Sequence, residues 1–248
     1  MKHYISMLVI AWVNVCAVTA QSNAPDHAPR QAHVIPGQTP TSPPLEVYFD
    51  RWDNGTAQPD EHGFIRNWML LEPIDKPNAT NTVFTDSYLR DVFSVKYFAK
   101  QLTQNPKNLP KNGQREKVGD EKLRWHALQS KMYNMKLFRF ASGLKTRVYG
   151  VMFWFYTIID CQEALTDVRL SVGSNAASMW WIDGKETLLL SGDRRMVMDD
   201  AASSLLTLGK GRHLIWGAVI NGPGMSDFCV RFIDQQHNPT RGFSVVNH

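Results

Sequence analysis

The sequence predicts an all-β protein, an antiparallel β-sandwich with few short helices. The main observation is a series of short apolar segments separated by turns that contain Gly, Pro or Asp. Short strands with closely spaced turn signals are typical of antiparallel sandwiches and barrels. Hydrophobic residues make up 43% of the 248 residues and charged residues 20%, which suits a globular protein with a substantial core. A net charge of +4 is too small to indicate nucleic-acid binding.

The first twenty residues have the layout of a secretory signal peptide. Residues 1–3 are a short basic start, residues 7–13 are an unbroken apolar run, and residues 18–20 are small or permissive. The apolar run ends at Asn14, well short of the about 20 residues that span a bilayer, and no later run is long and apolar enough. We therefore expect cleavage near Ala20, a secreted or periplasmic product, and no membrane span.

Residues 21–45 form a proline-rich segment, with six of the thirteen prolines among Ser, Thr, Gln and Asn. Such a segment buries too little apolar surface to fold on its own. We interpret it as a disordered tether between the signal peptide, residues 1–20, and a single β-sandwich domain. That domain covers residues 46–248, where aromatic and aliphatic residues become abundant.

Two strands and one helix are predicted in the first part of this domain. Residues 64–71 are apolar and rich in β-forming residues, which predicts a strand. Residues 85–98 carry apolar residues on one helical stripe, with Thr85 or Asp86 as the N-cap. Residues 149–159 are apolar on both alternating faces, so this strand should be buried on both faces, or pack on another chain or a loop.

The C-terminal part predicts a run of further short strands with tight turns between them. Asp183-Gly184 is a strong hairpin signal, and Gly209-Lys210-Gly211 marks a second turn. The predicted strands are residues 167–172, 179–182, 186–190, 205–208, 213–220 and 228–232. Most of them alternate apolar and polar residues, as expected where one face of a sheet is buried.

The order of these segments resembles the galactose-binding-like jelly-roll domains found beside carbohydrate-active enzymes in secreted bacterial proteins. The resemblance is carried by residues 68–74, 122–126, 149–159, 168–175, 179–185 and 208–214. Residues 193–200 and 222–229 are similar to proteins of gut Bacteroidetes labelled acetylxylan esterase or its accessory module. Many family members have Asp-Asp-Gly where this chain has Asn175-Ala176-Ala177, so a site that relied on that acidic pair is not carried over.

A non-catalytic carbohydrate-binding or accessory module is the leading hypothesis, with a polysaccharide or oligosaccharide as partner. Aromatic rings stack on the apolar faces of sugars, and Arg, Asn and Asp side chains hold the hydroxyl groups. The candidate aromatic residues are Trp180, Trp181 and Trp125. The polar candidates, expected to converge at one loop end, are Ser174, Asn175, Arg194, Arg195, Asn221 and Asp227. Core packing is the alternative for each Trp, and turn chemistry or surface pairing for each polar residue.

A carbohydrate esterase is the first alternative, although the chain has neither a Gly-x-Ser-x-Gly nor a His-Glu-x-x-His motif. Ser226 and Ser174 are the remaining nucleophile candidates, and a loop Ser that bonds the backbone is the simpler interpretation. A structural subunit of a homo-oligomer, packed through residues 149–159 on another chain, is the second alternative.

Two smaller site hypotheses each leave two alternatives open. Cys161 and Cys229 either form a disulfide in an oxidising compartment or remain separate buried thiols. Asp199 and Asp200 either bind Ca²⁺ on a loop or form a solvated turn with neighbouring Arg194 and Arg195 as counter-charges. No other cofactor is expected.

A basic stretch precedes the mid-chain Trp125. Residues 100–124 carry seven Lys or Arg against three acids, with Pro, Asn and Gly in the middle. A basic loop suits acidic sugars or a phosphate-bearing partner, and a solvated excursion is the alternative.

Overall fold

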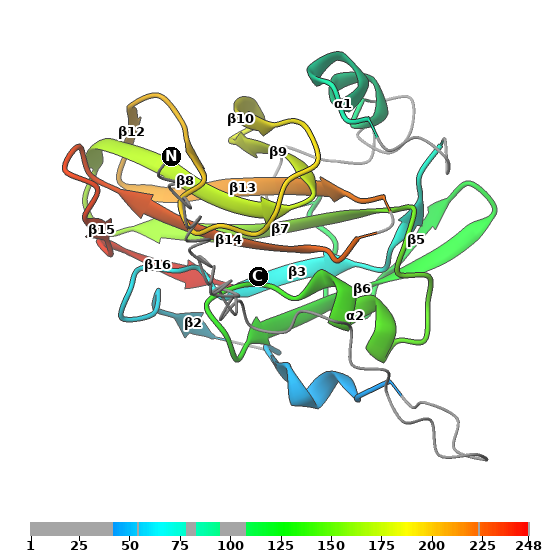
Figure 1. Ribbon diagram of the computed structural model, residues 1–248. Helices are drawn as coiled ribbons and strands as arrows, with labels where there is room; N and C mark the ends of the chain where they lie inside the picture. The colour runs from blue at the N-terminus through cyan, green and yellow to red at the C-terminus, as the bar shows by residue number, and fades with distance from the viewer. Residues whose placement is uncertain (1–41, 54, 78–82, 95–107, 223, 248) are drawn as a thin grey trace, which may run out of the picture. The chain divides into compact units, whose positions relative to one another are not determined.

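The computed structural model describes residues 42–53, 55–77, 83–94, 108–222 and 224–247 of the chain. The predicted signal peptide, residues 1–20, and all but the last residues of the predicted tether lie outside this described part. Within it the chain is an all-β, antiparallel sandwich with short helices, which confirms the predicted fold class (Figure 1). Neither described α-helix is long and apolar enough to cross a membrane.

The described elements are three short helices and two sheets. The helices are η1 (Leu45–Val47), α1 (Asp86–Val92) and α2 (Leu137–Gly143). The larger sheet contains β1 (Phe49–Arg51), β2 (Thr56–Ala57), β3 (Asn67–Leu71), β4 (Ile74–Asp75), β5 (Arg115–Val118), β6 (Glu121–Ser130), β7 (Val151–Cys161), β9 (Ala177–Ile182), β10 (Lys185–Leu190), β13 (Gly211–Ile220) and β16 (Phe243–Val246). The smaller sheet contains β8 (Leu165–Asn175), β11 (Ala201–Ala202), β12 (Leu206–Leu208), β14 (Asp227–Ile233) and β15 (Pro239–Thr240).

The larger sheet is built around β7, and its strand order is β1-β6-β3-β7-β13-β9-β10. β7 and β13 pair along their whole length, from Gly211 opposite Cys161 to Ile220 opposite Met152. The smaller sheet has the order β11-β8-β14-β15, with β12 also paired to β8. Because β8 pairs with β14 rather than with β7 or β9, the chain passes from one layer to the other at each end of β8.

An aromatic cluster joins the two layers. Trp68 of β3 meets the edges of Phe155 and Phe228 with ring centroids 5.5 and 5.1 Å apart, and Phe155 stacks on Phe228 at 4.1 Å. Trp180 packs against the same rings. A Cβ on Gly217 would lie 2.3 Å from Phe155 and 2.7 Å from Trp180, so glycine at this point of β13 makes room for the cluster.

A second apolar layer covers the opposite face of the larger sheet. Trp154 meets the edge of Phe93 at 5.4 Å, and the hydroxyl of Tyr156 donates a hydrogen bond to the Pro110 carbonyl. Trp216 and Tyr156 pack together at 4.8 Å. Residues from the α1 segment and from around Pro110 therefore cover the second face of β7, as one of the alternatives for residues 149–159 expects.

The α1 helix begins where the sequence predicts. Thr85 is the N-cap, and its Oγ accepts a hydrogen bond of 3.3 Å from the Tyr88 N–H. The predicted apolar stripe is buried, with Leu89 and Val92 at most 1% exposed. The helix ends at Val92, so the described residues Phe93 and Ser94 lie beyond it although helix was predicted there, and residues 95–98 lie outside the described part.

The end of the basic stretch before Trp125 is a β-hairpin, so the interpretation of the stretch as a loop is wrong for residues 115–124, whereas the described residues 108–114 contain no strand. Residues 115–124 fold as β5 and the start of β6. Leu123 and Trp125 are buried because apolar residues alternate with polar ones along β6. The high charge of the segment hides this alternation in the sequence.

Candidate functional site

Several of the polar residues expected at one loop end lie close together where β8 ends and β14 begins. Asp227 at the start of β14 lies opposite Asn175 at the end of β8. With its amide oriented to satisfy both acceptors, Asn175 donates to the Arg194 carbonyl at 2.8 Å and to the Met225 carbonyl at 3.2 Å. The segments that precede β11 and β14 are therefore joined through the amide of Asn175.

Asn221 also lies at this loop end, in the interior of the protein. This fully buried side chain accepts a 3.0 Å hydrogen bond from the Val151 N–H and donates a 2.8 Å bond to the Val148 carbonyl. It also donates to the hydroxyl of Ser226, which is 1% exposed. Both amide atoms of Asn221 are thus used to hold the loop between β13 and β14.

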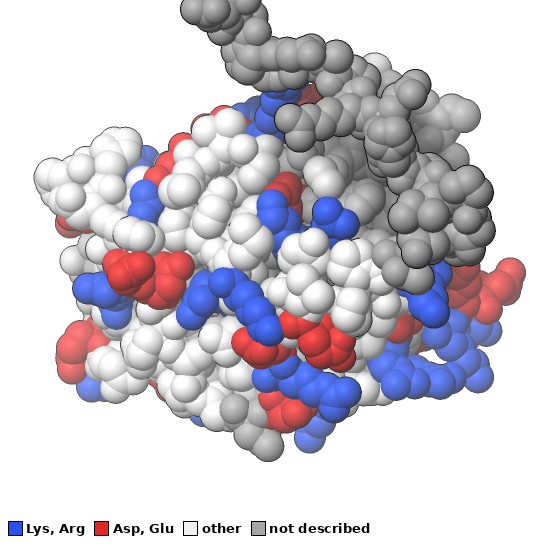
Figure 2. All heavy atoms as spheres, turned by 60° about the horizontal axis from the view of Figure 1, so that its bottom comes forward, with Lys and Arg blue, Asp and Glu red and all other residues white. Residues whose placement is uncertain are grey.

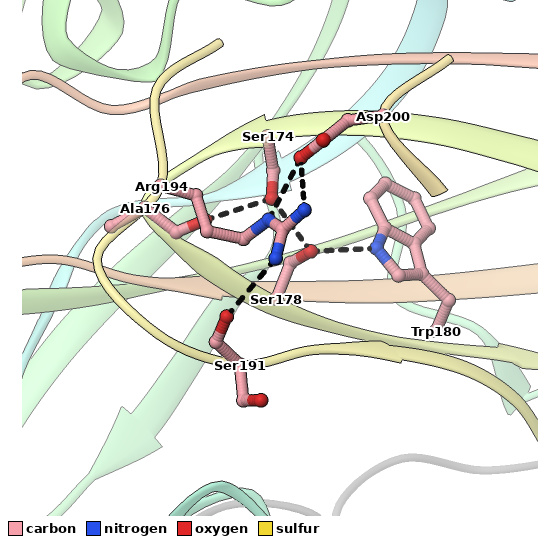
Figure 3. A network of polar contacts seen from close by, with 7 residues as sticks. All are labelled: Ser174, Ala176, Ser178, Trp180, Ser191, Arg194 and Asp200. Atoms are coloured by element: carbon pink, nitrogen blue, oxygen red, sulfur yellow. Dashed lines mark hydrogen bonds and ion pairs between the residues drawn. The ribbon is translucent and has the colours of Figure 1, made fainter. Parts of the chain in front are cut away.

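Ser174 belongs to a buried chain of hydroxyl groups (Figure 3). Its Oγ donates to the Ala176 carbonyl at 2.8 Å and lies 2.8 Å from the Ser178 Oγ, which accepts from the Trp180 Nε1 at 3.0 Å. Within the described residues, neither the Ser174 nor the Ser226 hydroxyl bonds to a His. Two inaccessible serines without a base do not have the setting of a nucleophile.

Two of the three candidate tryptophans belong to the core. Trp180 is 0% exposed between the sheets, and Trp125 is 1% exposed against Tyr156 and Trp216. The prediction that a sugar stacks on either of them is wrong, because neither ring presents a face to solvent. Trp181 is half-buried, stacked on Trp154 at 5.5 Å, and lies on the face of the larger sheet away from β8 and β14.

The adjacent aspartates are both held by arginines. Asp199 pairs with Arg231 and accepts a 2.6 Å hydrogen bond from Ser171, and Asp200 pairs with Arg194. Burial alone would raise the pKa of Asp199, but the bonds from Arg231 and Ser171 outweigh it and lower the pKa. The described residues contain no group of three or more His, Cys, Asp or Glu arranged to hold a metal ion. Ion pairs therefore engage both carboxylates, although Arg231 takes the place expected for the exposed Arg195.

Asp227 is also held internally. Its Oδ2 lies 3.0 Å from the Lys136 Nζ and accepts a 2.8 Å hydrogen bond from Asn134. Burial raises the pKa of this carboxyl group, and the bonds from Lys136 and Asn134 only partly oppose that effect. Together with Ser174, Asn175 and Asn221, this residue stabilises the loop end.

The two cysteines are separate buried thiols, so the disulfide alternative is not realised. Cys161 ends β7 in the larger sheet, whereas Cys229 lies in β14 of the smaller sheet. Burial raises the pKa of Cys161 to about 11 and that of Cys229 to about 12, which keeps both thiols protonated.

A polar groove of about 500 Å³ lies elsewhere, at the β1 edge of the larger sheet. Three groups of residues line it: the η1–β1 segment, the Asn112-Gly113 turn, and the face of β6 that carries Arg124 and His126. Its exposed polar side chains are Glu46, Asp50, Arg51, Asp53, Asn112 and Arg124. The groove therefore offers carboxylates that accept hydrogen bonds and guanidinium groups that donate them.

Asn112 fixes the side of the groove formed by the turn. Its Oδ1 accepts a 3.1 Å hydrogen bond from the Ala127 N–H of β6, and its Nδ2 donates to Asp53 at 2.9 Å. The N–H of Trp52 donates to the Ala127 carbonyl at 3.1 Å. The main chain next to Asp53 and the Asn112 turn are therefore both anchored to the same point of β6.

Glu72 supports the side of the groove formed by Arg124 and His126 of β6. Its two carboxylate oxygens accept from the Arg124 N–H at 3.0 Å and contact the His126 Nε2 at 2.9 Å. The His126 ring also meets the edge of Phe140 from α2 at 5.4 Å. The guanidinium group of Arg124 is not used in these contacts and remains exposed to the groove.

The sequence alone did not identify the groove residues, because they come from three separate segments of the chain. The one available signal was the alternation of Lys122, Arg124 and His126 with Leu123 and Trp125. That pattern indicates a strand with one polar face. The contribution of the η1–β1 segment has no comparable signal, because its pairing with β6 is long-range.

No protein-family model and no curated protein matches the chain. Among solved structures, it is similar to a PA14 sugar-binding domain from an RTX adhesin, with 8% identity, a TM-score of 0.40, and coverage of 74% of this chain and 99% of that domain. A β-glucosidase from Kluyveromyces marxianus matches with 14% identity and a TM-score of 0.37, over 74% of this chain and 20% of the enzyme. Its complex with glucose matches with 14% identity and a TM-score of 0.35, over 65% and 19%. At these TM-scores the similarities carry no conclusion about ligand or activity.

Proposed function

We propose that this chain is an exported carbohydrate-binding module whose ligand occupies the groove formed by η1, β1, the Asn112 turn and β6. The observation that carries the proposal is the mixture of exposed acceptors and donors along a groove of about 500 Å³. A volume of this order suits a small ligand such as a mono- or disaccharide unit. The signal peptide expected at residues 1–20 supports a role outside the cytoplasm.

The chemistry of the groove matches a ligand rich in hydroxyl groups. Each sugar hydroxyl both donates and accepts, so it is best held where carboxylates, amides and guanidinium groups alternate. Glu46, Arg51 and Arg124 form no side-chain hydrogen bond or ion pair within the described residues. Their bonding capacity is available to a ligand. Binding would rest on these polar contacts, since Phe49, the one Phe, Tyr or Trp in the described lining, is 2% exposed.

A glycan array probed with the full chain tests the proposal, followed by calorimetric titration of the best glycan with the wild type and Asn112→Ala. We expect Asn112→Ala to weaken binding about tenfold, because the amide and the orientation of Asp53 are lost together. Asn238→Ala is the matched control, since Asn238 is also exposed and donates to an aspartate, Asp234, at 3.1 Å.

Two results would contradict the proposal. One is an array on which the folded protein binds no glycan. The other is a glycan whose affinity is the same for the wild type and Asn112→Ala, which would place the binding site outside this groove.

A further inference from the structure

The β5–β6 hairpin has one face that carries only basic side chains. Arg115 lies opposite Arg124, and Lys117 lies opposite Lys122. Residues directly opposite in an antiparallel pair share a face, as do residues two apart along a strand. All four side chains therefore project from the same face, and all four are exposed. Figure 2 shows Lys and Arg side chains gathered at the right of the view, where this hairpin lies.

This arrangement works against the stability of the hairpin. Like charges directly opposite in a sheet are destabilising, and here both such pairs are cationic. The opposite face of the hairpin packs on the core, where Leu123 is 8% exposed and Val118 is half-buried. Cross-strand pairing on the basic face is therefore unfavourable, whereas the opposite face packs on the core.

Three of the four cations on the basic face have no acidic partner in the described part of the chain. Within the described residues, Arg115, Lys122 and Arg124 form no ion pair, and neither does Arg51 in the adjoining groove. Many cations elsewhere are paired, including Arg194 with Asp200 at the loop end. An unpaired guanidinium group can bind a carboxylate or sulfate through two parallel hydrogen bonds.

The basic face is continuous with the groove. Arg124 belongs to both, and His126 is the next residue on the same face of β6. Acids in and beside the groove have neighbouring partners, since Asp50 lies 3.2 Å from the Lys131 Nζ and Glu72 contacts the His126 ring. A chain held in the groove and extended along the hairpin would therefore pass from a mixed surface to a positive one.

We propose that the ligand is an acidic polysaccharide, with a sugar unit in the groove and its carboxylate or sulfate groups along the basic face of the β5–β6 hairpin. This inference rests on the proposed function and adds the chemical class of the ligand. Electrostatic binding of this kind weakens as salt screens the charges.

The test is the affinity of the full chain for polygalacturonate, which carries carboxylates, for chondroitin sulfate, and for a neutral galactan. We expect at least one acidic polymer to bind about tenfold more tightly than the neutral one, with the preference lost between about 0.05 and about 0.5 M NaCl. Lys122→Gln/Arg124→Gln should remove most of this preference. Lys145→Gln/Lys185→Gln removes the same charge from other exposed positions and should retain it. Thermal unfolding of both variants checks that they are folded.

Each outcome decides between the two proposals. Equal binding of acidic and neutral glycans, sensitive to Asn112→Ala, would overturn this inference and leave the carbohydrate-binding proposal intact. Absence of binding to all three polymers would overturn this inference, whereas the glycan array decides the carbohydrate-binding proposal. Equal affinity for duplex DNA or for vesicles of anionic phospholipid would also overturn the inference, because the face would then be a general polyanion surface.

Discussion

The loop end and the groove contain similar residue types, but the groove leaves more of them accessible to a ligand. At the loop end, Ser174 and Asn221 are 0% exposed and bonded to the protein itself. In the groove, Arg51 and Arg124 are exposed and unpaired within the described residues. Convergence of polar side chains therefore does not by itself make a binding site. What matters is hydrogen-bonding capacity that the fold has not already used.

The largest expected effect on stability is that of Trp180→Ala, which tests whether Trp180 is a core residue or part of a binding site. Trp180→Ala leaves a cavity between the sheets and should lower the free energy of unfolding by about 3–5 kcal/mol, measured by urea denaturation. Trp181→Ala, at a half-buried position, should cost clearly less. A Trp180→Ala protein of wild-type stability that loses glycan binding would contradict the assignment of Trp180 to the core, because Trp180 would then act as a sugar platform.

At the loop end, Asn221→Ala should be the next most damaging change. It leaves the Val151 N–H and the Val148 carbonyl without their partner, and unsatisfied buried groups of this kind cost about 2–3 kcal/mol in total. Urea denaturation measures the loss, and glycan affinity of the variant, measured at a temperature where it is folded, should be unchanged. Weakened glycan binding by that folded variant would indicate that the loop end takes part in binding, which would contradict its structural role.

In the groove, Asp53→Asn should have the opposite effect to Asn221→Ala: glycan affinity should fall while stability is retained. The substituted amide keeps an oxygen for the Asn112 Nδ2, so the change in unfolding free energy should stay within about 0.5 kcal/mol. Glycan affinity should fall about fivefold, because hydrogen bonds to a charged acceptor are stronger than those to a neutral one. Calorimetric titration measures the affinity. An unchanged affinity would show that the Asp53 carboxylate does not contact the ligand.

The smallest effect concerns His213, which belongs to neither region. Its Nδ1 contacts Asp183 and its Nε2 contacts the Gly209 carbonyl, each at 2.7 Å, so only the imidazolium form donates to both. Burial alone would lower the pKa of His213, but the bonds to Asp183 and Gly209 outweigh it and raise the pKa. This stabilisation is complete below the unfolded pKa of 6.5 and is lost as pH rises through the raised folded value.

His213→Gln should therefore lower Tm more at about pH 5 than at about pH 9. Differential scanning fluorimetry at both values measures the difference, and glycan affinity should be unaffected. A larger loss of stability at high pH than at low pH would contradict the charged state assigned to this side chain.

Local patterns were enough to predict the fold class and several elements. The Asp183-Gly184 turn between β9 and β10 is an example, with φ angles of 50° and 78° that match the positive values of a tight hairpin turn. The Thr85 cap is another, because its partner lies only three residues away. Such features depend on neighbouring residues, so the sequence contains all the information needed.

The site could not be predicted in the same way. Whether Asn221 is free or bonded depends on Val148 and Val151, which are far away in sequence. The groove depends on the pairing of β1 with β6, where Asp50 lies opposite Gln129. In both cases the deciding contacts are long-range and have no local signature.

Hydrogen–deuterium exchange of the full chain, with and without a saturating glycan, locates the binding surface. The expected result is slower exchange in residues 45–53 and 112–128, which form the groove and the hairpin, and no change in residues 191–200 and 221–226 at the loop end. Protection confined to the loop end, with the groove unaffected, would contradict the proposed binding site.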